Sequence, residues 1–64
     1  MKKGMAVLLM NMLASEFGYK VEWASLPETR NMDVLCLDNH EGDRQEFRGD
    51  EKFEQAVKWL RTKL

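Results

Sequence analysis

The feature that most constrains the fold of this 64-residue chain is an apolar run near its beginning. Ten of the thirteen residues from Met5 to Phe17 are apolar, mostly methionine, leucine and alanine. These residue types favour helices, and the β-branched types that favour strands are nearly missing. Gly18, a common residue just past a helix end, follows directly. The sequence therefore predicts a helix over residues 4–17.

This helix carries more apolar surface than a surface helix needs. At about 100° per residue, one broad face collects five apolar side chains. They are Ala6, Leu9, Met10, Leu13 and Phe17. A neighbouring arc collects Met5, Leu8 and Met12, and the polar strip is narrow, made of Gly4, Asn11 and Ser15. A surface helix is normally apolar over roughly a third of its circumference, and this one exceeds that.

Two interpretations of the surplus stay open. In the first, both apolar faces are buried within one chain, one on a sheet and one under a second helix. In the second, the arc of Met5, Leu8 and Met12 lies at an interface, because exposed apolar patches mark interaction sites and methionine suits adaptable surfaces. We expect the second, with Trp59 as a further contact residue.

The middle of the chain reads as three strands. Residues 19–25 alternate, with Tyr19, Val21 and Trp23 on one side, where we expect Tyr19 and Trp23 to enter the core. Residues 26–31 contain a proline and read as a loop. Residues 32–37 are apolar on both sides, as in a central strand, with residues 38–43 as a turn. Residues 44–48 give a weaker third strand.

The last segment predicts a helix that begins at Gly49 and Asp50, with Asp50 as the N-cap and Glu51 at the positive end of the helix dipole. Its apolar stripe is about 100° wide. The stripe consists of Phe53, Ala56, Val57, Leu60 and Leu64. Trp59 lies on the flank of this stripe, where it covers the core edge or touches a partner.

These elements give the order α-β-β-β-α. Short connections favour a three-stranded antiparallel meander with two helices packed on one face, an α+β fold forming a single domain over residues 1–64. The order of elements resembles that of double-stranded RNA-binding domains, which hold phosphates with a lysine-rich start to the last helix. Here that place reads GDEKFEQ and opens with two acids. The resemblance therefore covers topology only.

The stretch CLDNHEGD holds the only cysteine and the only histidine of the chain. A metal site would use Cys36, Asp38 and His40, with or without Asp43, but this spacing matches no established zinc or calcium pattern. A nucleophilic Cys36 would need His40 within hydrogen-bond distance, and a hairpin tip places such a histidine in solvent. We expect a buried structural thiol and a polar turn, with no metal and no cofactor.

The remaining features bear on the class of protein. The chain has ten basic and eleven acidic side chains without long runs of one sign, unlike a nucleic-acid binder. The sequence contains no glycine-rich phosphate-binding loop and no serine-histidine-aspartate catalytic triad. A chain this small is also hardly able to enclose a pocket for a small-molecule substrate. A nucleic-acid-binding domain remains an alternative if five basic residues share one face. They are Lys20, Arg44, Arg48, Lys58 and Arg61.

The first fourteen residues resemble a secretory signal peptide, with two lysines before an apolar run. Asn11 interrupts that run, and the run is shorter than the roughly 20 residues that span a bilayer. A single thiol also fits a reducing compartment. We therefore expect a cytoplasmic, non-enzymatic protein-binding or regulatory module, homodimeric or bound to a protein partner, of a size common among phage and prophage accessory proteins.

Overall fold

Two helices flank three strands along the chain, as the sequence predicts. The computed structural model describes residues 2–25 and 33–64. The elements are α1 (Lys3–Phe17), β1 (Lys20–Ser25), β2 (Asp33–Asp38), β3 (Arg44–Phe47) and α2 (Lys52–Arg61). Their bounds differ from the predicted ones by at most three residues. The predicted loop at residues 26–31 and the predicted strand start at Met32 lie outside the described residues.

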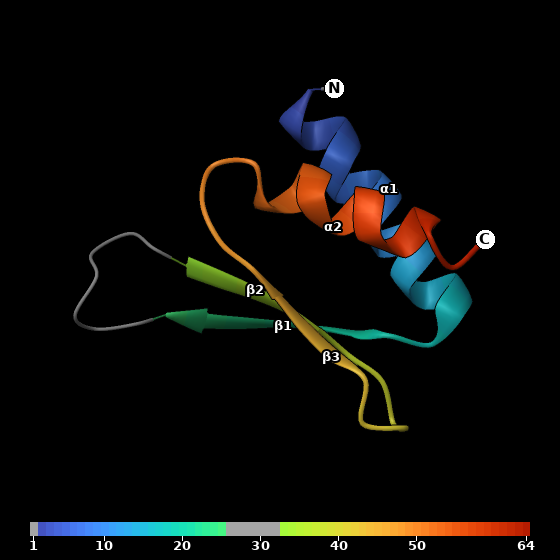
Figure 1. Cartoon of the computed structure of the whole chain (residues 1–64). Helices are drawn as coiled ribbons and strands as arrows, with labels where there is room; N and C mark the ends of the chain where they lie inside the picture. Colours follow the sequence, from blue (N-terminus) through green and yellow to red (C-terminus); the bar gives the residue numbers. More distant parts are fainter. Residues whose placement is uncertain (1, 26–32) are drawn as a thin grey trace.

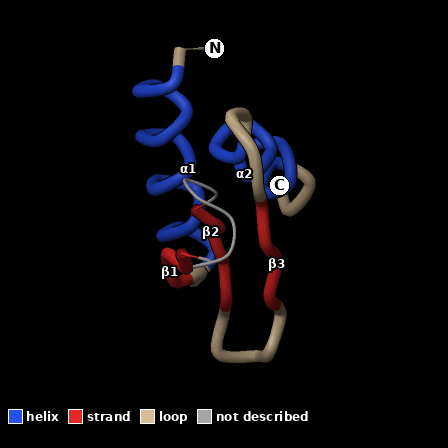
Figure 2. Tube along the Cα trace, turned by 90° about the vertical axis from the view of Figure 1, so that its left-hand side faces the viewer, coloured by secondary structure: helices blue, strands red, loops and turns tan. Residues whose placement is uncertain are grey.

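The strands form an antiparallel meander in the order β1-β2-β3. Val21 of β1 stands opposite Leu37 of β2, and Leu35 of β2 stands opposite Phe47 of β3. Both helices lie on the same face of this sheet (Figure 1). Figure 2 shows α1 on the side of β1 and α2 on the side of β3, with the helices packed beside each other. The expected α+β fold is confirmed.

The core lies between the two helices and the sheet. Because side chains alternate along a strand, Leu35 and Leu37 of β2 both point toward the helices and are fully buried. The helices meet them with side chains that are 0–3% exposed. These are Ala6, Met10 and Ala14 of α1 and Ala56, Val57 and Leu60 of α2. The alanines let the two helices approach closely.

The end of α1 is set by Gly18, as predicted. Gly18 has a φ of 77°, a left-handed conformation that glycine adopts without steric cost. Its N–H donates to the carbonyl of Ser15 at 3.3 Å, and the N–H of Tyr19 donates to that of Ala14 at 2.8 Å. These bonds close the last helical turn and direct Tyr19 into the core, where it is 9% exposed.

Two details predicted for the last helix are wrong. Its N-cap is Glu51 rather than Asp50, and no side chain caps it. The reason is a turn that starts at Gly49 and takes up Asp50, closed by the Lys52 N–H donating to the Gly49 carbonyl at 3.3 Å. Leu64 does not continue the apolar stripe, because the helix ends at Arg61 and Leu64 is 81% exposed.

Candidate functional site

The candidate site is an exposed apolar strip on α1, which we call the outer face of α1 and define by Met5, Leu8 and Met12. These side chains are 54%, 55% and 59% exposed. Their spacing of three and four residues places them above one another along one side of the helix. Ala6 and Met10, which face the core, are 0% and 1% exposed. One side of α1 is therefore buried in the core, while the opposite side is apolar and exposed.

Few large apolar side chains are exposed elsewhere in the described part of the chain. Four large apolar residues there are more than half exposed, and only Leu64, at the chain end, lies outside the strip. Leu9 and Leu13 are partly buried and extend the strip toward the core. At the other edge Asn11 donates its side-chain N–H to the Val7 carbonyl at 3.0 Å, so this amide is turned back onto its own helix.

Trp59, the fourth predicted contact residue, is not part of this face. Its ring meets Tyr19 edge-on at 5.2 Å and Phe47 at 5.9 Å between centroids, and Lys63 Nζ lies 4.5 Å from its centre. These contacts place it at the edge of the core, which is one of the two positions expected for it. The side chain of Trp23, expected in the core, lies outside those that the structure describes.

A polar cluster at the end of the sheet was missed by the sequence reasoning. The Tyr19 hydroxyl donates to Asp43 Oδ2 at 2.5 Å, and Lys63 Nζ lies 3.4 Å from the same oxygen. The hydrogen bond from Tyr19 lowers the pKa of Asp43, and the same bond raises the pKa of Tyr19. Asp43 lies 24 positions from Tyr19 and 20 positions from Lys63 in the sequence. Contacts between residues so far apart leave no periodic pattern from which they could be predicted.

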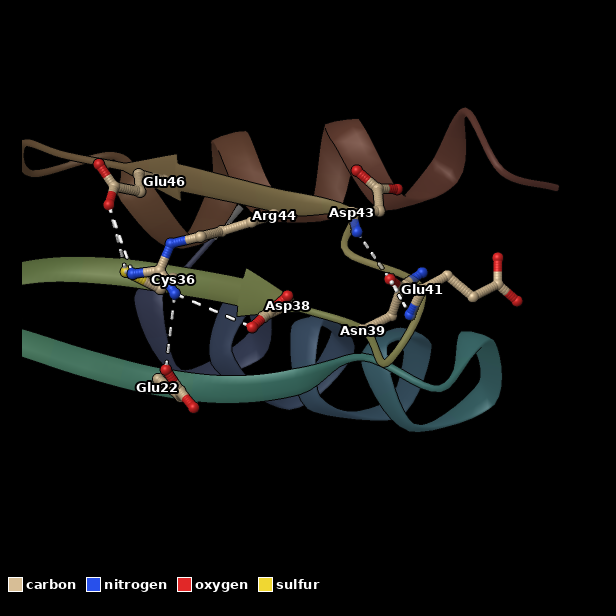
Figure 3. Close-up of polar contacts among 8 residues, drawn as sticks. All are labelled: Glu22, Cys36, Asp38, Asn39, Glu41, Asp43, Arg44 and Glu46. Carbon is tan, nitrogen blue, oxygen red and sulfur yellow. Dashed lines mark hydrogen bonds and ion pairs between the residues drawn. The ribbon is translucent and has the colours of Figure 1, made fainter.

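Cys36 lies on the sheet face opposite the helices, beneath Arg44. The thiol is 1% exposed, and Arg44 Nη2 donates to its sulfur at 3.3 Å. Figure 3 shows the guanidinium lying across the strands between Glu22, Asp38 and Glu46, at 3.5–3.9 Å from their carboxylates. Burial raises the pKa of Cys36, so the thiol stays protonated. This is the chemistry of a structural cysteine, as expected.

The residues considered for a metal or nucleophile site do not converge. Cys36 and Asp38 share a face, as predicted, but His40 is exposed in the turn and Asp43 faces Tyr19. Across residues 2–25 and 33–64, no three histidine, cysteine, aspartate or glutamate side chains gather as a metal-binding group. The turn is ordered by Asn39 instead, whose Oδ1 accepts the Asp43 N–H at 2.9 Å.

The five basic residues of the nucleic-acid alternative are divided between two layers. Lys20 and Arg44 stand beside Asp38 on the open face of the sheet, and Arg48 contacts Glu46 at 3.1 Å. The other two, Lys58 and Arg61, lie on α2. The first residues of that helix, where the RNA-binding domains carry lysines, are preceded by the exposed acids Asp50 and Glu51. Lys20 and Arg44 therefore lie on a different layer of the fold from Lys58 and Arg61.

No protein-family model, no curated protein and no solved structure matches this chain. Within the described residues, neither helix is long and apolar enough to cross a membrane.

Proposed function

We propose that this chain is a small non-enzymatic protein-binding or regulatory module. It acts by occupying a partner's surface with the outer face of α1, and it pairs with itself through the same face. The observation that supports this is the exposure of Met5, Leu8 and Met12, each more than 50% uncovered on one side of a helix. Monomeric proteins rarely leave large side chains contiguous and uncovered without an interaction to cover them.

The expected strength of such a contact follows from the exposed area. Fully burying one of these side chains is worth about 1.5–3 kcal/mol, so burying the exposed half is worth roughly 1 kcal/mol. Over two copies this gives about 6 kcal/mol, against a cost of at least about 4 kcal/mol for lost translational and rotational freedom. The net gain of at most about 2 kcal/mol makes the self-contact weak, with a dissociation constant on the order of 30 mM or weaker from these side chains alone. Such a face exchanges readily between a second copy and another protein.

The proposed setting is the cytoplasm. Cys36 is a free thiol in the centre of the sheet. A reducing compartment preserves such thiols, whereas an oxidising one favours disulfides. The burial of the thiol also removes it from nucleophilic chemistry, in keeping with a module that binds rather than catalyses.

The test is photo-crosslinking in the native host. A photoreactive amino acid replaces Leu8 on the outer face of α1 and, as the matched control, Glu54 on the exposed side of α2. We expect position 8, and not position 54, to give a covalent product with a protein, whether a second copy or a different chain. Equal labelling from both positions, or none from position 8, contradicts the proposal.

A further inference from the structure

The charges at the two ends of α1 are opposite to those that its own dipole favours. Exposed Lys2 and Lys3 stand at its positive N-terminal end, and exposed Glu16 stands in its last turn. The first turn contains no acid and the last turn contains no base. In α2 the usual pattern holds, with Glu54 in the first turn and Arg61 in the last. The reversed charges of α1 are thus unfavourable within one chain.

The spacing of these charges matches the helical repeat. Leu9 lies seven residues, or two helical turns, before Glu16, so these two residues lie along one edge of the outer face of α1. Lys2, the extended N-cap residue, precedes the first turn at the other end of the helix. Seven residues also separate Met5 from Met12, with Leu8 between them. This order of apolar side chains, Met-Leu-Met, reads the same in both directions.

We propose that the occupant of the outer face is a second copy of this chain, with its α1 antiparallel and the two-fold axis passing beside Leu8 and Leu9. This inference rests on the proposed function and specifies how two copies pair through that face. The two-fold axis brings Lys2 of each copy level with Glu16 of the other and exchanges Met5 with Met12 across the seam. The N-terminal end of each helix then lies beside the acidic Glu16 of the other copy, and the C-terminal end lies beside the basic Lys2. The two helix dipoles are antiparallel, which is also favourable.

The parallel arrangement lacks these pairings. It would place Lys2 beside Lys2 and Glu16 beside Glu16, so both ends would carry like charges in contact. An antiparallel pair gains two ion pairs of opposite sign, each of the modest strength typical of exposed pairs. Charge therefore sets the orientation, and the apolar seam supplies most of the affinity.

Zero-length carbodiimide coupling of the purified wild-type protein tests this arrangement. Lys2 and Glu16 of one chain lie about 20 Å apart along the helix axis, too far for a direct amide bond between them. Any Lys2–Glu16 amide therefore joins two chains. We expect this linkage to be the main intermolecular product at protein concentrations near about 1 mM.

Four variants act as controls. Glu16→Gln removes the linkage, and Glu54→Gln on α2 leaves it unchanged. Leu8→Asn keeps both charged residues but interrupts the apolar seam, so the yield falls about fivefold or more. The double variant Lys2→Glu with Glu16→Lys restores an amide between the same two positions.

The failure of this inference is distinguishable from the failure of the proposed function. An absent Lys2–Glu16 linkage, or an equal yield from Leu8→Asn, overturns the antiparallel self-pairing. If position 8 still crosslinks to a different protein in the host, the binding function stands and only the second copy is excluded. If neither product forms, both proposals are wrong.

Discussion

At the scale of single residues, the side chains that look chemical in the sequence are structural in the fold. Cys36 is the clearest case, because it lies buried in the central strand beneath Arg44. Its position between Val34 and Leu37 predicts this burial. Its contact with Arg44 could not be predicted, since it depends on the register between β2 and β3.

Cys36 should react slowly with thiol reagents. Burial and a raised pKa both limit the thiolate available at neutral pH. We expect labelling by iodoacetamide to be on the order of a hundredfold slower in buffer than in concentrated urea, because reaction must await opening of the sheet. Equal rates in the two solvents would mean that the thiol is accessible in the folded protein.

Asp43 should contribute stability that depends on pH. Its pKa is lowered from the ordinary value of 3.8 by the hydrogen bond from Tyr19 and the nearby Lys63, so the folded protein favours the ionised form. That contribution is complete above the unfolded pKa and is lost as pH falls through the lower folded pKa. We expect Asp43→Asn to lower the melting temperature by a few degrees at pH 7, with the difference closing as the pH falls below the ordinary carboxyl value of 3.8. A difference that stays constant with pH would contradict this assignment.

At the scale of elements, Gly4 and Gly18 differ in the backbone conformation that each position requires. Gly18 ends α1 with a φ of 77°, whereas Gly4 is helical, and a Cβ at either position meets nothing within 4 Å. Because space is equal at both sites, only the backbone conformation separates them. We expect Gly18→Ala to cost about 1–2 kcal/mol in urea unfolding and Gly4→Ala to be neutral or stabilising. Similar losses for both variants would argue against a conformational cause.

The two sides of α1 should respond differently to truncation. Met10 is 1% exposed and Met12 is 59% exposed on the same helix. Met10→Ala should destabilise the fold by about 2–5 kcal/mol, a large share of what so small a domain possesses. Met12→Ala should change the stability of dilute protein by less than about 0.5 kcal/mol. A large loss from Met12→Ala in dilute solution would mean that this side chain is covered within one chain.

The positions of the helices were easier to predict from the sequence than the contacts that their faces and ends make. The helical periodicity of residues 5–17 and the following glycine suffice to place α1, and its surplus of apolar residues indicates an uncovered face. Periodicity cannot decide which arc of α1 meets the sheet and which meets α2. The N-cap at Glu51 was not predictable, because it depends on the turn that Gly49 starts.

At the scale of the whole molecule, size limits how much of α1 can be covered. A chain of this length buries only about 60% of its unfolded surface. Three strands and one further helix cover one side of α1, and the described residues leave the outer face open. The topology was predictable from the order of periodic segments. The long-range Tyr19–Asp43–Lys63 cluster was not, because it requires the three-dimensional arrangement of the strands and the chain end.

The most direct test follows the methionine methyl groups of purified, ¹³C-methyl-methionine-labelled protein by NMR from about 50 µM to about 2 mM. Self-contact through the outer face of α1 predicts that the Met5 and Met12 signals shift with concentration while the Met10 signal, from the buried side of the same helix, stays in place. Concentration-independent signals for Met5 and Met12, or equal shifts for Met10, would contradict the account.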